Sequence, residues 1–110
     1  MKSLQSNLQK IQTALVGVTA SCYHYWRAKA TPPYLIWAED GEMDSFESDN
    51  HKQEQQLHGT ADYFTKTEFD MTVDAIQDAL NGIMTGWRLS SVQYEDDTGL
   101  IHYEWEWWVI

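Results

Sequence analysis

Two pairs of side chains in this sequence have the type and spacing for catalysis. Cys22 and His24 stand two residues apart, so in a strand both point to one side, where a histidine could activate a thiol nucleophile. No orienting third group stands nearby, which favours an ordinary pair of strand residues. Glu104 and Glu106 would lie about 7 Å apart along a strand, like the carboxylates of a glycosidase. Alternate strand residues usually form a plain polar face, so we expect no catalytic residue.

Possible metal ligands are also present. The acidic stretch at residues 39–50 offers the oxygen ligands that calcium prefers. Counted from Asp40, however, the sixth residue is a serine and the twelfth is His51, where a helix-loop-helix calcium site has glycine and glutamate. His51, His58 and His102 share no spacing typical of zinc sites. A solvated acidic segment is therefore favoured, and we expect neither a metal nor another cofactor.

The elements that would position these residues include a β-hairpin at the end of the chain. Residues 86–95 and 100–110 form its two arms, and Gly99 accepts the positive φ that a short hairpin turn requires. The second arm alternates strictly between an aromatic face and a polar face. The aromatic face holds Tyr103, Trp105, Trp107 and Val109, and the other holds His102, Glu104, Glu106 and Trp108.

Apolar residues recur at helical spacing in two segments. In the first, Ser3 is the expected cap and the helix should end near Gly17. In the second, Asp70 or Thr72 is the expected cap and Gly82 marks the expected end. The buried stripes are Leu4, Leu8, Ile11, Leu15 and Val18 in the first helix, and Val73, Ile76, Leu80 and Ile83 in the second.

The segments between the two helices are predicted to be extended or irregular. Residues 19–26 and 34–38 are expected to pair as a hairpin through the basic loop at residues 27–31. Residues 39–50 should form an exposed, mobile loop, because they are rich in acids and small polar residues. Residues 51–66 resemble one long polar strand, which favours an edge strand open to another subunit.

This order of elements predicts the fold class. Two helices and five strands joined mostly by hairpins indicate an α+β fold in which the helices pack on a mostly antiparallel sheet, in the order α-β-β-β-α-β-β. A chain of 110 residues has the size of one domain, so residues 1–110 are expected to fold as a unit.

Charge is divided unevenly along the chain. Residues 1–38 hold four basic residues and no acid, whereas residues 39–110 hold all seventeen acids and three basic residues, which gives net charges of +4 and −14. Such acidity argues against a general nucleic-acid binder, which needs a basic stripe to neutralise phosphates. The split favours complementary faces that meet between copies of the chain or meet another partner. A plain solvated surface is the open alternative.

Other features of the composition exclude further classes. No apolar run approaches the ~18 residues of a membrane helix, and the amino terminus lacks the apolar block of a signal peptide. The single cysteine permits no internal disulfide, which fits a reducing cytoplasm. Of the six tryptophans, Trp37, Trp87, Trp105 and Trp107 are expected in the core. Trp108 lies on the opposite strand face, where an intersubunit contact is expected.

Three segments carry a resemblance to a known family: Pro33 to Gly41 (PYLIWAEDG), Gly59 to Lys66 (GTADYFTK), and Gly86 through Trp105. They resemble the small tail-completion or tail-terminator proteins of long-tailed phages and prophages of Gram-positive bacteria. The similarity covers most of the chain and includes the order of elements, and its motifs are structural. It implies a small α+β subunit that forms a typically hexameric ring at the head-proximal end of the tail tube, where it ends tube growth and joins tail to head.

The resemblance also implies partners and locations. The partners would be further copies of the chain, the tail tube protein and the head-tail connector protein. Neither a membrane nor a specific nucleic acid is implied, although genome DNA would pass through the ring. The chain would reside in the virion, and in the host cytoplasm during assembly.

Two regions of the chain are expected to carry these contacts. The acidic segment resembles the part that faces the channel or a neighbour, and repulsion by an acidic lumen would keep passing DNA from sticking. The acids in this segment are Glu39, Asp40, Glu42, Asp44, Glu47 and Asp49. The subunit interface is expected to include Lys2, Lys10, Arg27, Lys29, Trp108 and Ile110.

Two other functions stay open at the level of sequence. Another head-tail connector or neck protein would have the same class of fold. An acidic, host-directed inhibitor that mimics nucleic acid would also be small and free of catalytic groups. Self-association distinguishes these classes, because a mimic works as a monomer or dimer and a terminator must form a ring.

Overall fold

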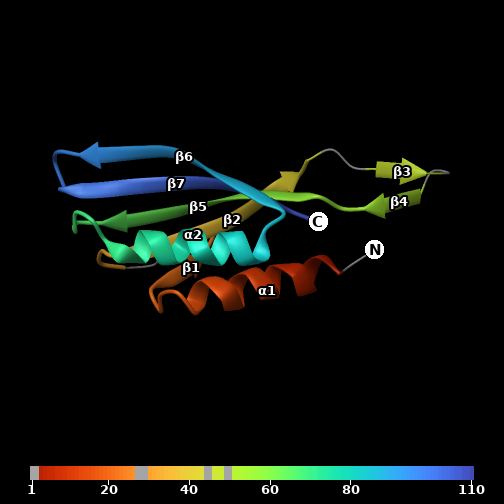
Figure 1. Ribbon diagram of the computed structural model, residues 1–110, viewed down its shortest axis with the longest axis horizontal. Helices are drawn as coiled ribbons and strands as arrows, with labels where there is room; N and C mark the ends of the chain where they lie inside the picture. Colours follow the sequence, from red (N-terminus) through yellow and green to blue (C-terminus); the bar gives the residue numbers. More distant parts are fainter. Residues whose placement is uncertain (1–2, 27–29, 44–45, 49–50) are drawn as a thin grey trace.

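The computed structural model describes residues 3–26, 30–43, 46–48 and 51–110. In this part of the chain, two helices lie on one face of a five-stranded sheet, and a two-stranded ribbon extends from one end (Figure 1). The elements in chain order are α1 (Leu4–Val16), β1 (Cys22–His24), β2 (Tyr34–Glu42), β3 (Phe46–Ser48), β4 (His51–Glu54), β5 (Leu57–Thr65), α2 (Met71–Ile83), β6 (Gly86–Glu95) and β7 (Leu100–Val109). The predicted α+β fold is confirmed. The ribbon strands β3 and β4 were not predicted as a separate pair.

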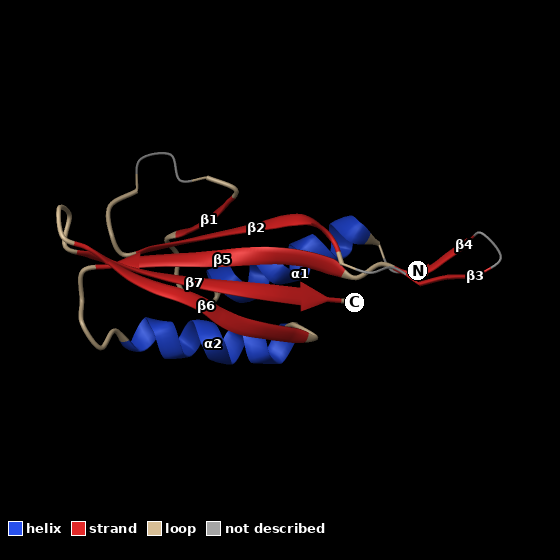
Figure 2. Cartoon of the chain, turned by 90° about the horizontal axis from the view of Figure 1, so that it is seen from above, coloured by secondary structure: helices blue, strands red, loops and turns tan. Residues whose placement is uncertain are grey.

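The five-stranded sheet has the order β1-β2-β5-β7-β6. Its pairs are antiparallel except for β1 and β2, which run parallel. Figure 2 shows β5 and β7 at the middle of the sheet and β6 at its edge. The pair of β6 and β7 is the predicted C-terminal hairpin, and Gly99 in its turn has a φ of +71°.

Both helices form where the apolar spacing predicts them. The hydroxyl of Ser3 accepts a hydrogen bond from the Ser6 backbone N–H and begins α1, as predicted. The Asp70 carboxylate caps α2 in the same way. The prediction that Gly82 marks the end of α2 is wrong: Gly82 lies inside the helix, and the chain becomes extended at Met84. Neither helix is long and apolar enough to span a membrane.

Aromatic side chains fill the space between sheet and helices. Trp37, Trp105 and Trp107 are each at most 1% exposed, and Trp87 packs against them, so the predicted core tryptophans are confirmed. Trp107 lies flat over Gly59 of the neighbouring strand, where an added Cβ would come within 2.2 Å of the indole. Only glycine leaves room for this indole, so the position of Trp107 in the core depends on Gly59.

The predicted hairpin of the first two strands is wrong. β1 pairs with β2 in parallel, with Cys22 opposite Leu35 and His24 opposite Trp37. Tyr25, which has a φ of +76°, turns the chain away from the sheet at the end of β1. Parallel pairing places the start of β2 beside the start of β1, and the chain between the two strands is shorter than most parallel crossovers. Alternation of side chains alone does not distinguish parallel from antiparallel pairing.

The prediction of one long polar edge strand at residues 51–66 is also wrong. The segment divides into β4, which pairs with β3 in the ribbon, and β5, which is the central strand of the sheet. One face of β5 is buried at every second residue from Leu57 to Thr65. On its other face, the charged and polar groups of His58 and Asp62 have partners on neighbouring strands, and Phe64 stacks between Tyr34 and His102. Such pairing lets a polar strand occupy the middle of a sheet.

The predicted acidic loop at residues 39–50 is wrong in its first part. Residues Glu39 to Glu42 belong to β2 and pair with β5 across a register shift between Glu39 and Gly41. Residues Phe46–Ser48 form β3 of the ribbon, which extends past the body of the molecule (Figures 1 and 2). The ribbon contributes to a length of 54 Å against widths of 24 and 23 Å.

Candidate functional site: the open face of the sheet

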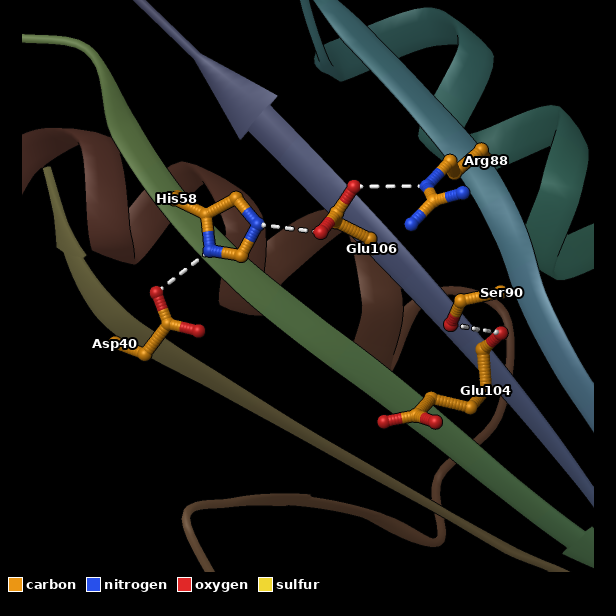
Figure 3. Close-up of polar contacts among 6 residues, drawn as sticks. All are labelled: Asp40, His58, Arg88, Ser90, Glu104 and Glu106. Carbon is orange, nitrogen blue, oxygen red and sulfur yellow. Dashed lines mark hydrogen bonds and ion pairs between the residues drawn. The ribbon is translucent and has the colours of Figure 1, made fainter. Parts of the chain in front are cut away.

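The face of the sheet opposite the helices carries a row of charged side chains that crosses four strands (Figure 3). His58 on β5 has Nδ1 2.6 Å from Asp40 Oδ1 on β2, and Nε2 3.1 Å from Glu106 Oε2 on β7. The other oxygen of Glu106 accepts a hydrogen bond of 2.9 Å from Arg88 Nε on β6. Carboxylates only accept hydrogen bonds, so a histidine that donates to both carries a proton on each nitrogen. We call these four residues the charge row.

The pKa values in the charge row favour this protonation state. Partial burial disfavours the charge of His58, but the hydrogen bonds to Asp40 and Glu106 outweigh it and raise the pKa of His58 above its ordinary 6.5. The pKa of Glu106 is lowered, because Arg88 and, to a smaller extent, His58 donate hydrogen bonds to its carboxylate. The charge row therefore joins β2, β5, β7 and β6 by alternating charges.

A second polar pair lies on the same face, nearer the turn of the C-terminal hairpin. His102 Nε2 on β7 is 2.7 Å from Asp62 Oδ1 on β5. Burial raises the pKa of Asp62, against the opposing effect of His102. The ring of Phe64 stacks on His102 with 4.2 Å between centroids, and Tyr34 stacks on Phe64 at 4.8 Å. This end of the face is thus an aromatic platform with one acid at its side.

The middle of the face holds Glu104, beside a bulge in β6 between Leu89 and Ser91. Ser90 Oγ donates to the main-chain oxygen of Glu104 at 3.0 Å (Figure 3), and Ser91 Oγ donates to its carboxylate at 3.3 Å. The strand register and the printed contacts place five acids on this face, Asp40, Asp62, Glu95, Glu104 and Glu106, against the two cationic groups of the charge row, His58 and Arg88. The open face is therefore predominantly acidic, although part of its charge is paired.

A third histidine-carboxylate pair lies at the β1 edge of the sheet. The ring of His24 stacks between Tyr25 and Trp37, with 3.8 Å between centroids on each side. Its Nε2 is 2.6 Å from Glu39 Oε1, and the Tyr25 hydroxyl donates to the other oxygen. Burial disfavours the charge of Glu39, but these two hydrogen bonds outweigh it and lower the pKa of Glu39. Glu39 is thus bound within the chain.

The geometry does not support either candidate for catalysis. Cys22 is 8% exposed, and burial raises the pKa of its thiol to about 11, so the thiol is protonated at neutral pH. Glu106 already bonds to two cationic side chains, and its pKa is lowered, whereas a general acid of a glycosidase requires a raised one. Among the described residues, no three His, Cys, Asp or Glu side chains gather as metal ligands.

The predicted acidic residues are only partly brought together. Asp40 lies in the charge row, Glu39 at the β1 edge, and Glu42 accepts a hydrogen bond of 2.9 Å from Gln55. Glu47 lies on β3. Asp44 and Asp49 lie outside the described residues. In the part of the chain that the structure describes, these residues therefore do not form a single acidic loop.

The structure brings two of the predicted interface residues together. Lys10 of α1 and Ile110 at the chain end line a groove of about 380 Å³, which we call the end groove. Its apolar walls are Ile11, Ile83, Met84 and Val109. Trp108 is elsewhere, on the open face, where its indole lies against Gly86. Lys2, Arg27 and Lys29 lie outside the described residues.

The charge row is the feature that the sequence does not reveal directly. His58 and Glu106 each stand in an alternating polar pattern, which is the available signal. Their meeting depends on the register of β5 against β7, in which Thr60 faces Glu106 and His58 faces Trp108. Register between strands so far apart in the chain requires the structure.

The comparisons with known proteins add a likeness of fold. No protein-family model matches the sequence, and no curated protein matches it. Among solved structures, the fold resembles a chain from the virion of a native gene transfer agent particle, with a TM-score of 0.58 and 10% sequence identity. The alignment covers 96% of this chain and 92% of that chain. At such low identity, the likeness shows that the two chains share a fold.

Proposed function

We propose that this chain is a structural protein of a phage-like virion, where copies form the ring that ends the tail tube and joins tail to head. The observation that carries the proposal is the shared fold with a gene transfer agent virion chain, which covers 96% of one chain and 92% of the other. Because almost all of both chains is covered, the likeness concerns a whole subunit and not a common motif. The family resemblance of the sequence supports the finer assignment to the tail end.

The open face of the sheet is the part that would line the channel of such a ring. Its acids outnumber the two cationic groups described there, His58 and Arg88, while Lys10 lies away from it on α1. An acidic wall repels the phosphates of passing DNA and lets the DNA slide without sticking. In this proposal, the channel is lined by the charge row and Glu104, and the helices face outward or toward other subunits.

The proposed partners follow from this place in the particle. The ring contacts the tail tube protein on one side and the head-tail connector protein on the other, and it needs neither enzymatic activity nor a cofactor. The chain would be synthesised in the host cytoplasm and retained in the virion. The alternative function that the tests must distinguish from this one is that of an acidic inhibitor that mimics nucleic acid.

The first test is the native mass of the purified chain across a concentration series, with negative-stain images of any large species. The proposal predicts closed rings of uniform copy number at high concentration. A monomer or dimer at every concentration would favour the nucleic-acid mimic. Open filaments of variable length would argue against a ring.

A second test removes the gene from the phage or prophage that encodes it and measures the particles. Loss of a tail terminator should give tails of uncontrolled length that do not join heads. Tails of normal length beside unjoined heads would instead indicate a connector in the neck. Unchanged particles would contradict both assignments.

A further inference from the structure

Phe69 is held in an unusual conformation between β5 and α2. It has a φ of +60°, in the left-handed region that a bulky side chain rarely adopts, and 86% of the residue is exposed. Both features are unfavourable for the isolated chain, because the backbone is strained and a large apolar ring stands in water. Met71, two residues later, is 72% exposed as well.

The loop around Phe69 is fixed by hydrogen bonds to the sheet and to α2. The Asp70 carboxylate accepts from the hydroxyls of Tyr63 and Thr65, each at 2.8 Å, and from the Thr72 backbone N–H at 2.9 Å. Tyr63 and Thr65 are each 1% exposed, so these bonds are protected from water. Phe69 is therefore presented by a rigid support, and little conformational entropy would be lost when it binds.

The end groove lies at the other end of α2. Ile83 and Met84 at the C-terminal end of the helix form one wall, and Ile11 and Ile110 contribute from α1 and the chain end. Its volume of about 380 Å³ lies within the ~300–1,000 Å³ of ligand pockets, which is ample for a phenyl ring. Gly82 leaves the helix surface bare, since an added Cβ there would meet nothing within 4 Å.

The charged residues directly next to Phe69 and the one at the end groove are opposite in sign. Glu68 and Asp70 flank Phe69 in the chain, with the exposed Lys66 three residues before it, whereas Lys10 stands at the end groove. An apolar ring next to an acid at one end of α2 thus matches an apolar groove next to a lysine at the other end. In Figure 1, α2 runs along the longest axis of the molecule, and the two features lie at opposite ends of this helix.

We propose that Phe69 of one copy inserts into the end groove of the next copy. The 13 residues of α2 place Phe69 and the end groove about 20 Å apart on each subunit. Such a contact joins two different surfaces, head to tail, and therefore propagates from copy to copy until it closes into a ring or continues as a filament. The closure into a ring rests on the proposed function, but the contact itself does not.

Cysteine cross-linking tests the pairing directly. Glu68→Cys, which keeps the ring of Phe69, and Ile110→Cys are made separately, and the buried Cys22 stays in both, with the unmodified chain as its control. Under mild oxidation, a mixture of the two variants should give a cross-linked dimer, and neither variant alone should do so. A double variant should give a ladder of covalent oligomers. Absence of the mixed dimer at the highest soluble concentration would overturn the contact.

Two substitutions weaken the contact without disturbing the fold. Phe69→Gly removes the ring and suits the left-handed backbone. Gly82→Leu fills the groove from a position with no neighbour within 4 Å. Each should raise the concentration for half-maximal assembly by about tenfold or more, because a buried aromatic anchor is lost or blocked. Trp26→Ser, at another exposed aromatic (68%), is the matched control and should leave assembly unchanged.

Thermal midpoints measured at a concentration too low for assembly provide the check on folding, and both variants should then melt at or above the temperature of the unmodified chain. Assembly by folded Phe69→Gly and Gly82→Leu at the original concentration would overturn the contact.

The outcomes separate this inference from the proposed function. Rings that persist in both variants would overturn the contact and leave the ring proposal standing. Cross-linked ladders that grow without limit, together with normal tails after removal of the gene, would confirm the contact and overturn the tail-end role.

Discussion

At the scale of single residues, His58 explains how a polar strand occupies the centre of the sheet. Its side chain is 20% exposed, and burial in that position opposes a charge. Asp40 and Glu106 on the two flanking strands reverse the balance, because each accepts one of the two ring N–H groups. The charged histidine thereby links three strands.

The raised pKa of His58 predicts a pH-dependent stability. The folded chain binds the proton of His58 more tightly than the unfolded chain does, so the stabilisation is complete below pH 6.5 and is lost as pH rises through the folded pKa. Urea midpoints should therefore fall as pH rises above 6.5, and His58→Gln should lose most of that slope. The lowered pKa values of Glu39, Asp70 and Glu106 act only at lower pH. Parallel curves for the two proteins would contradict the assignment.

Substitution of glycine by alanine is expected to have opposite effects on the free energy of unfolding at Gly59 and at Gly82. Gly59→Ala would place a Cβ 2.2 Å from the Trp107 ring and 2.3 Å from the Ala38 main-chain oxygen, and the free energy of unfolding should fall by about 3 kcal/mol. Gly82→Ala meets open space within α2 and should raise it by up to about 1 kcal/mol. Urea denaturation of both variants measures the difference, and an equal effect at both positions would refute this account of the core.

At the scale of elements, α2 is tied to the sheet by its cap. The carboxylate of Asp70 satisfies the first turn of the helix and also two hydroxyls at the end of β5. Burial disfavours the charge of Asp70, but these hydrogen bonds outweigh it and lower the pKa of the carboxyl. One residue therefore binds the end of β5, begins α2 and supports the loop that presents Phe69.

Removal of this cap should destabilise the whole domain. Asp70→Ala deletes the bond to the Thr72 N–H and leaves the hydroxyls of Tyr63 and Thr65 without their carboxylate partner, so the free energy of unfolding should fall by about 2–3 kcal/mol. Asp78→Ala, at an exposed position in the middle of α2, should change it by less than about 0.5 kcal/mol. Similar losses in urea denaturation would show that the cap has no special role.

The elements that the sequence predicts well are those with strong local patterns. The stripes of α1 and α2 and the alternation of β7 depend on near neighbours in the chain, and the stripe of α2 and the alternation of β7 are confirmed. The stripe of α1 is confirmed at Leu8, Ile11 and Leu15, but Leu4 is exposed and Val18 lies beyond the end of the helix. The parallel pairing of β1 and the central place of β5 depend on contacts between distant segments of the chain. The sequence predicted a hairpin and an edge strand instead, and both predictions were wrong. The charge row needs the same long-range register. Its acids were visible in the sequence, but their partners were not.

At the scale of the whole molecule, the two faces of the sheet differ in chemistry. One face is covered by the helices and closed by tryptophans, and the other is open and carries Asp40, Asp62, Glu104 and Glu106. The end groove and Phe69 lie at opposite ends of α2, in the helix layer. Copies joined through these ends can therefore keep their open faces on the same side of the assembly.

Reversal of charge on the two faces predicts different affinities for DNA. Assembled Glu104→Lys should retain duplex DNA at low salt and release it as salt rises, because the new lysine is repeated around the proposed channel. Asp78→Lys makes the same change of charge on α2 and should retain less. Gel shifts and filter binding over a salt series measure both. Equal retention by the two variants would show that the open face does not line the channel.

The burial of Cys22 also makes the motion of one sheet edge measurable in time. Its thiol is 8% exposed on β1, a strand of three residues that pairs only with β2. A thiol reagent must wait until this short edge opens, so the rate of modification reports how often the opening occurs. Because the chain has one cysteine, every labelled molecule records the same event. The rate of Cys22 modification thus measures local opening of the β1 edge without an engineered cysteine.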